Sequence, residues 1–311
     1  MLANKFRKTI LLFLKGMAMG AADSVPGVSG GTIALISGIY QEFLDSLRNI
    51  NFVALGLLFK SGPKAAWAHI NGNFLLTLFG GILFSIVSFS KLILYCLDHY
   101  PILVWAFFFG LVCASIVYIL RQVSHWRWQE IIALCCGVLV AVGVTLIRPP
   151  SLPGEWWILM IAASVAICAM ILPGISGMFI LFLFGLHTVM YQAIAEFNWL
   201  LLGSFAVGAG VGLLLFSHLL SWLLHHYYNS TLAVLIGFLI GSLKLLWPWQ
   251  HTIVSSVDRH GDTVPLVKEL VSPYDYVSLV GQEPQIMFAV IAAVFGFVIV
   301  FILELSAEKS Q

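Results

Sequence analysis

The sequence predicts an all-α polytopic membrane protein built as an inverted-topology repeat, in which each half holds one re-entrant helical hairpin and three transmembrane helices. Three observations support this class. Of the 311 residues, 60% are apolar and 9% are charged, whereas soluble proteins average roughly 45–50% and about 25%. Apolar runs long enough for membrane helices recur along the chain. One interrupted apolar run occurs twice, with a similar motif in each copy.

The charge balance excludes whole classes of function. The formal net charge is only +1, so no basic surface is available to hold a nucleic acid. The scarcity of charged residues also excludes a soluble enzyme. The five cysteines lie inside apolar runs without metal-ligand spacing, and we interpret them as packing residues. The sequence therefore implies no metal and no cofactor.

Six uninterrupted apolar runs reach, or come close to, the length needed to cross a hydrocarbon core about 30 Å thick. Two further regions, residues 11–43 and 156–195, are each interrupted by proline and glycine. Lipid cannot satisfy the backbone groups that such a break releases, so the break must face protein or a wet cavity. We interpret each region as a re-entrant hairpin with its tip near mid-membrane. The expected spans are residues 74–97, 102–120, 131–147, 200–224, 231–247 and 286–303.

The basic residues set the expected orientation. If the N-terminus is cytoplasmic and both hairpins return to their own side, ten of the 15 basic residues lie inside, three outside and two within spans. A single crossing by residues 11–43 would move Arg48, Lys60 and Lys64 outside, which fits the rule less well. We therefore expect a multi-pass protein with both termini in the cytoplasm. Residues 49–73 would form an inner loop, and the polar residues 250–285 an outer lid or connector.

The two interrupted regions are copies of each other. Further matches follow both copies, so the halves are residues 1–148 and 149–311. Because each half makes an odd number of crossings, the second half is inverted, as in secondary transporters whose site lies at the repeat interface. The matching positions are Pro26-Gly27-Val28-Ser29-Gly30 with Pro173-Gly174-Ile175-Ser176-Gly177, Gly38 with Gly185, His99-Tyr100 with His226-Tyr227, and Gly110 with Gly237.

The broken helices predict an anion site between the two tips. A helix that begins inside the membrane directs unpaired N–H groups and a partial positive charge toward whatever precedes it, which suits a phosphate group. Hydroxyl groups beside the glycines add further donors. The alternative is that proline and glycine only shape the turns and allow close helix packing. The candidate phosphate-binding residues are Ser29, Gly30, Gly31, Thr32, Ser176 and Gly177.

A second set of candidates is charged or polar. Asp23 is a carboxylate at membrane depth, and with Ser24 and Glu42 it forms a candidate coupling or polar site. For Asp23, proton or cation coupling stays open beside two structural roles, capping of the following helix and pairing with a buried cation. Near the expected outer ends of the spans, Lys91, Arg148 and Lys244 form either a cationic funnel for a lipid head or a set of snorkelling side chains.

The sequence lacks the motifs of ATP-driven and zinc-dependent enzymes. There is no Walker A or HExxH motif, and Arg148-Pro149 lacks the other residues that membrane lipid phosphatases need. We therefore expect no enzyme, and gradients rather than ATP as the driving force. Two alternatives to a lipid transporter stay open: a secondary transporter of a small soluble anion, and a membrane enzyme that acts on prenyl phosphates.

The two motifs together resemble the signature of a bacterial membrane family linked to polyprenyl-phosphate transport, the PopT-like family, which was formerly a domain of unknown function. The resemblance spans nearly the whole chain. It implies an inner-membrane flippase that returns undecaprenyl phosphate from the outer to the cytoplasmic leaflet for peptidoglycan and other cell-envelope synthesis. The residues that carry it are Ala22-Asp23-Ser24-Val25-Pro26-Gly27-Val28-Ser29-Gly30-Gly31-Thr32, Gly38-Ile39-Tyr40 and Ile171-Leu172-Pro173-Gly174-Ile175-Ser176-Gly177.

Such a substrate suits the predicted architecture. A charged head that crossed hydrocarbon bare would cost many kcal/mol, because a charge at the bilayer centre is expensive. A transporter needs only to carry the head through a polar cleft while the tail stays in the lipid. We therefore expect a small anion pocket at mid-depth that opens sideways between helices, with the polyprenyl-phosphate lipid and the bilayer as the partners.

Overall fold

The computed structural model describes residues 2–23, 29–146, 152–257 and 263–308. Most of this chain is helical, and long apolar helices make it a helical membrane protein. The first part contains α1 (Leu2–Asp23), α2 (Gly30–Ile36), α3 (Tyr40–Arg48), α4 (Phe52–Lys60), α5 (Pro63–His69), α6 (Gly72–His99), α7 (Pro101–Gln122) and α8 (Trp128–Leu146). The second part contains α9 (Trp156–Ile171), α10 (Gly177–Leu183), α11 (His187–Ala195), α12 (Trp199–His226), α13 (Tyr228–Ser242), β1 (Gln250–Val257), β2 (Thr263–Leu270), α14 (Tyr276–Val280) and α15 (Ile286–Glu308).

Each of the six expected spans coincides with a helix. Within the described residues, α6, α7 and α12 contain stretches long and apolar enough to cross a membrane. The apolar parts of α8, α9, α13 and α15 are shorter, between 10 and 17 residues. Helix α13 ends at Ser242, five residues before the expected boundary at Trp247, because the chain turns through Leu243–Leu246 and reaches Pro248.

Each interrupted region contains three helices instead of the expected two arms. Behind each break the returning chain is split again, at Gly38 (φ +72°) and at Gly185 (φ +69°). At both splits an N–H bonds back to the carbonyl five residues earlier, from Ile39 to Ala34 (3.1 Å) and from Leu186 to Leu181 (2.9 Å). This is the glycine-dependent Schellman ending of a helix. The expectation of one continuous return arm was therefore wrong, because a left-handed glycine ends each first segment.

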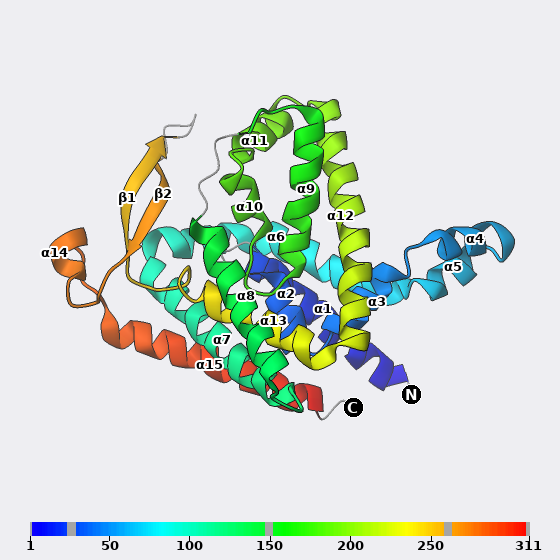
Figure 1. Ribbon diagram of the computed structural model, residues 1–311, viewed down its shortest axis with the longest axis horizontal. Helices are drawn as coiled ribbons and strands as arrows, with labels where there is room; N and C mark the ends of the chain where they lie inside the picture. The colour runs from blue at the N-terminus through cyan, green and yellow to red at the C-terminus, as the bar shows by residue number, and fades with distance from the viewer. Residues whose placement is uncertain (1, 24–28, 147–151, 258–262, 309–311) are drawn as a thin grey trace.

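Two excursions leave the helical bundle at opposite ends of its long axis (Figure 1). One is the pair α4 and α5. The side chain of Asn51 caps the start of α4. This pair presents large apolar side chains outward, with Phe52 91% and Phe59 80% exposed. The other excursion holds β1, β2 and α14. The two expected loops, 49–73 and 250–285, thus project from different ends of the molecule.

The β1–β2 hairpin is an exception to the all-α class. The two strands pair antiparallel, with irregularities between Thr252 and Ser255. Two indole N–H groups fasten the base of this excursion, from Trp247 to the carbonyl of Val271 (3.0 Å) and from Trp249 to that of Pro284 (2.8 Å). A small separate core underlies it, formed by Ile102, Ala106, Trp249, Val271, Tyr276 and Ala289. The polar composition of the segment did not reveal its strands.

The bundle is built from four closely packed helix pairs: α1 with α6, α9 with α12, α8 with α13, and α7 with α15. The last two pairs join the first part of the chain to the second. At every crossing a glycine lies against a carbonyl of the partner helix, where an added Cβ would overlap that oxygen. These contacts are Gly81 on Phe13, Gly208 on Met160, Gly237 on Leu134 and Gly110 on Ala293.

Helix α12 offers a matched test of this packing. In Gly208→Ala the new methyl group would overlap the Met160 carbonyl, whereas the position of Gly210 is open space within 4 Å. We expect Gly208→Ala to destabilise the fold by about 1–3 kcal/mol, the usual cost of overpacking. Gly210→Ala should be neutral or stabilising by up to about 1 kcal/mol, since alanine favours a helix. Thermal unfolding of the purified protein in detergent measures both, and equal melting temperatures would contradict the packing argument.

Candidate functional site

The described residues that follow the first break lie against the end of α9 and the second break. The Ser29 hydroxyl donates to the carbonyl oxygen of Met170 (2.8 Å), and the Tyr40 hydroxyl donates to that of Ile171 (3.1 Å). In the opposite direction, the backbone N–H of Gly174 donates to the Thr32 hydroxyl oxygen (3.2 Å). Three hydrogen bonds therefore connect segments that are more than 130 residues apart in the sequence.

These contacts satisfy backbone carbonyl groups at the end of α9. Helix α9 ends at Ile171, so the carbonyls of its last turn have no partner within the helix. Hydroxyl groups of Ser29 and Tyr40, both buried, supply two of the missing donors. Gly31 lies directly against the Ile171 carbonyl, where no Cβ would fit. Gly174 has φ +83°, a conformation that favours glycine, and a Cβ at this position would meet the Phe238 carbonyl oxygen.

The donors at the start of α2 are bound within the chain. The N–H of Gly30 donates to Asp23 Oδ1 (2.7 Å), and the N–H of Gly31 donates to the Ser29 hydroxyl oxygen (3.1 Å). Ser29 is the N-cap of α2. Asp23 therefore has the capping role that was one of its alternatives. In the described part of the chain no cation pairs with it, since the ion pair found within 4.0 Å is between His225 and Asp45.

The remaining candidate residues do not take part in the three hydrogen bonds between the breaks. Ser176 is buried just before α10, and Gly177 packs against the carbonyl of Ala166 on α9. Ser24 lies outside the described residues, as does the Pro26-Gly27 step. Glu42 is exposed on α3 and accepts a hydrogen bond from the side chain of Asn71 (3.0 Å). Glu42 is therefore held by the loop before α6 and does not join Asp23.

The expected cationic funnel is only partly described. Lys244 is exposed immediately after α13. Lys91 lies in the second half of α6, and only the course of its backbone is described. Arg148 falls outside the described residues. The funnel therefore stays a prediction.

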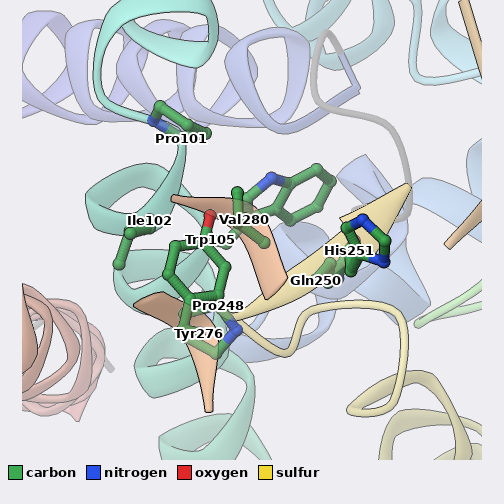
Figure 2. Close-up of a pocket in the computed structure, with 8 residues that line it drawn as sticks. All are labelled: Pro101, Ile102, Trp105, Pro248, Gln250, His251, Tyr276 and Val280. Atoms are coloured by element: carbon green, nitrogen blue, oxygen red, sulfur yellow. The ribbon is translucent and has the colours of Figure 1, made fainter. Parts of the chain in front are cut away.

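A cavity of about 290 Å³ lies away from the breaks, where the start of α7 meets Pro248 and α14 (Figure 2). Aromatic and apolar side chains dominate its wall, and Gln250 and His251 add polar groups. None of its lining residues belongs to either break. Within the described residues, no three His, Cys, Asp or Glu side chains lie close enough to hold a metal ion.

Tyr40 is a site residue that the sequence did not predict. Its side chain is 3% exposed, and its hydroxyl reaches across to the other break. One feature of the sequence pointed to Tyr40. It belongs to Gly38-Ile39-Tyr40, which follows the first break and is part of the family resemblance. A hydroxyl next to a chain reversal has the reach to satisfy a helix end nearby, but only the fold shows which helix end.

An anion could bind to these donors only by replacing the acceptors that already occupy them. Its donors are hydroxyl and backbone N–H groups, the kind that surround phosphate in proteins. In this conformation the Ser29 hydroxyl is engaged by Met170, and the Gly30 N–H by the Asp23 carboxylate. A phosphate would have to replace these internal acceptors, and the expected anion pocket between the two tips stays a prediction.

Comparison with known proteins gives consistent matches. A family model described as undecaprenyl phosphate translocase-like matches residues 19–264. A polyprenyl-phosphate transporter of Vibrio cholerae serotype O1 is 42% identical over 308 residues, covering 99% of this chain and 100% of the relative. A polyprenyl-phosphate transporter of Staphylococcus aureus is 34% identical over 254 residues, covering 76% of this chain and 85% of the relative. No solved structure matches the chain.

The contact between the breaks can be tested with Tyr40→Phe. Loss of the hydroxyl leaves the Ile171 carbonyl without this donor in a buried place, which costs about 1–3 kcal/mol. We expect a lower melting temperature in detergent. Tyr95→Phe is the control, because the Tyr95 side chain is 52% exposed on α6. An unchanged melting temperature for Tyr40→Phe would mean that this hydrogen bond does not hold the breaks together.

Proposed function

Because this chain belongs to the undecaprenyl phosphate translocase-like family, we propose that it is a transporter of polyprenyl phosphate in the bacterial cytoplasmic membrane. It returns undecaprenyl phosphate from the outer to the cytoplasmic leaflet, where the lipid carries precursors for the cell envelope. The protein moves the phosphate head, and the polyprenyl tail stays in the lipid. This separation avoids the cost of placing a bare charge at the bilayer centre.

The observation that carries the proposal is the meeting of the two breaks. Phosphate oxygens accept hydrogen bonds from hydroxyl and N–H groups, and those of Ser29, Thr32, Gly30 and Gly174 are gathered there. We assign head binding to Ser29, Gly30, Gly31, Thr32, Ser176 and Gly177. The phosphate replaces Asp23 and the α9 carbonyls as the acceptor when the breaks part.

We infer that the two parts of the chain, residues 1–148 and 149–311, are inverted repeats with re-entrant hairpins. Three of the six pairs of equivalent helices have equal lengths: α6 and α12 have 28 residues each, α2 and α10 seven, and α3 and α11 nine. The packing supports the same relation, since α1 lies on α6 as α9 lies on α12. The positive-inside rule then assigns the end with α4 and α5 to the cytoplasm, and we call it the inner face.

We propose that Asp23 couples transport to an ion gradient. Its carboxylate caps α2 and leaves that position only when a proton or a substrate anion takes over one of its interactions. Asp23→Asn keeps a hydrogen-bond acceptor for Gly30 but has no titratable group. We expect this variant, in proteoliposomes, to lose gradient-driven uptake of polyprenyl phosphate while still exchanging lipid between leaflets. If uptake by Asp23→Asn depends on external pH in the same way as uptake by the unchanged protein, coupling through Asp23 is ruled out.

The head-binding assignment predicts a transport defect in Ser29→Ala/Thr32→Ala. Hydrogen bonds to a charged group contribute roughly 1.5–3 kcal/mol each, so losing two should reduce uptake at least about tenfold. Ser115→Ala is the control, since this serine is also fully buried but bonds only within α7, to the Leu111 carbonyl. Uptake of labelled prenyl phosphate into proteoliposomes measures both variants.

The same assay decides between the functional alternatives. Uptake of inorganic phosphate without lipid movement would favour a transporter of a small soluble anion. Release of phosphate from the lipid would favour a membrane enzyme. In cells that lack the protein, and in which redundant flippases are also removed, we expect the lipid carrier to accumulate at the outer surface.

A further inference from the structure

A polar cluster joins α3 to α12 away from the two breaks. The Ser221 hydroxyl on α12 donates to Asp45 Oδ1 on α3 (2.6 Å). The Arg48 guanidinium, also on α3, donates to the Ser221 oxygen (3.3 Å). His225 Nε2 on α12 faces Asp45 Oδ2 at 3.9 Å. Four side chains thus form one connected group between the two helices.

Helical spacing puts these side chains on facing surfaces. Asp45 and Arg48 are three residues apart on α3, and Ser221 and His225 are four apart on α12, so each pair shares one side of its helix. The Nδ1 atom of His225 bonds to the Ser221 carbonyl (2.8 Å), which leaves Nε2 directed at Asp45. The cluster is therefore held in place from both helices.

The cluster runs from the protein interior to the protein surface. Ser221 is fully buried, whereas the side chains of Asp45 and His225 are 37% and 42% exposed. The apolar residues beside it, among them Leu44, Leu47 and Leu224, are buried and close the rest of the contact. Since α12 ends here at His226 and α3 leads to α4, this contact lies at the inner face.

The residue types match a phosphate group. A hydroxyl, a guanidinium and an imidazole are common phosphate ligands, and a guanidinium binds two phosphate oxygens at once. Among the described residues no carboxylate lies within 4.0 Å of Arg48, so its charge has no close ion-pair partner. The acceptor that Ser221 and His225 face here is the carboxylate of Asp45.

We propose that the contact between α3 and α12 is the inner exit for the phosphate head, with Asp45 as its closure and Arg48 as the residue that receives the phosphate. This proposal rests on the proposed function. Asp45 holds the two helices together through the Ser221 hydroxyl, with the His225 ring beside it, while the exit is closed. When α3 moves away from α12, the phosphate monoester takes the donors that Asp45 has left, and Arg48 adds the cation.

The position of α3 in the chain connects this exit to the breaks. α3 follows α2, whose first residues contact the second break, and the two helices are joined at Gly38. Gly38 is exposed and nothing lies within 4 Å of its Cβ position, so the joint is open on this one side. A change at the breaks can therefore move α3 relative to α12.

Reversible locking tests the closure. In a variant whose five native cysteines are replaced by alanine, Asp45→Cys/Ser221→Cys is joined by a short thiol cross-linker that a reductant removes. We expect cross-linking to lower polyprenyl-phosphate transport at least about tenfold and reductant to restore it. Each single-cysteine variant should keep its own rate under the same treatment. Full transport by the cross-linked protein would overturn the proposal.

A labelling experiment tests the exit without any transport assay. Ser217 is fully buried one turn before Ser221 on the same side of α12, so Ser217→Cys reports water entering between the helices. Adding Asp45→Asn to the reporter should raise the rate of maleimide labelling at least about fivefold, because the closure is weakened. An unchanged labelling rate would overturn the role of Asp45.

The same reporter tests Arg48 and the ligand. In the Asp45→Asn background, farnesyl monophosphate should slow labelling at least about threefold, Arg48→Lys should keep part of this protection and Arg48→Gln should abolish it. Protection that survives Arg48→Gln, or no protection at all, would overturn the assignment of Arg48. Equal protection by inorganic phosphate would identify free phosphate as the ligand of the exit. If the protein with its native cysteines moves no lipid, the proposed function fails, while the labelling rates still decide whether this exit exists.

Discussion

Backbone groups released by a broken helix cannot be satisfied by lipid, and in this protein two broken segments satisfy each other. The carbonyls at the end of α9 accept from Ser29 and Tyr40, and the N–H of Gly174 donates to Thr32. Neither break could stay buried alone at an acceptable cost, since an unsatisfied buried group costs about 1–3 kcal/mol. The contact between distant parts of the chain is therefore a condition for having the breaks at all.

This mutual satisfaction also connects structure to transport. The donors that suit a phosphate are the ones that hold the breaks together, and the Asp23 carboxylate already occupies the N–H of Gly30. An arriving anion then competes with internal acceptors of similar chemistry. Under the proposed function, such competition lets the protein close without substrate and open with it, because the closed state needs no unpaired polar group.

The helices of this protein meet through two kinds of contact. The four main helix pairs meet through glycines that touch partner carbonyls, which leaves little freedom for sliding. The contacts at the breaks and between α3 and α12 also contain close packing, as at Gly31 and Leu224, but they add a few hydrogen bonds, several of them from side chains. Such bonds can be exchanged for bonds to a ligand or water at small net cost. Movement should therefore concentrate at α2 and α3 and leave the paired helices as a frame.

Much of the fold followed from the sequence, for physical reasons that act locally. Hydrophobic length located a helix at each of the six expected spans, and proline and glycine located both breaks, because charge and unpaired backbone groups are costly anywhere in a bilayer. Composition could not reveal the second split at Gly38 and Gly185, since a left-handed glycine and a helical one have the same sequence signal. The strands of residues 250–270 were missed because their polar sequence carries no clear alternation.

For the site, the sequence by itself determined which chemical groups are available: small hydroxyls, glycine amides and the carboxylate of Asp23. Only the tertiary structure decided their partners. Asp23 meets Gly30, Tyr40 meets Ile171, and Glu42 turns to Asn71 instead of joining Asp23. The reason is that a hydrogen bond depends on distances of about 3 Å between atoms. Between residues far apart in the sequence, those distances are set by how whole helices pack, which no local pattern of residues encodes.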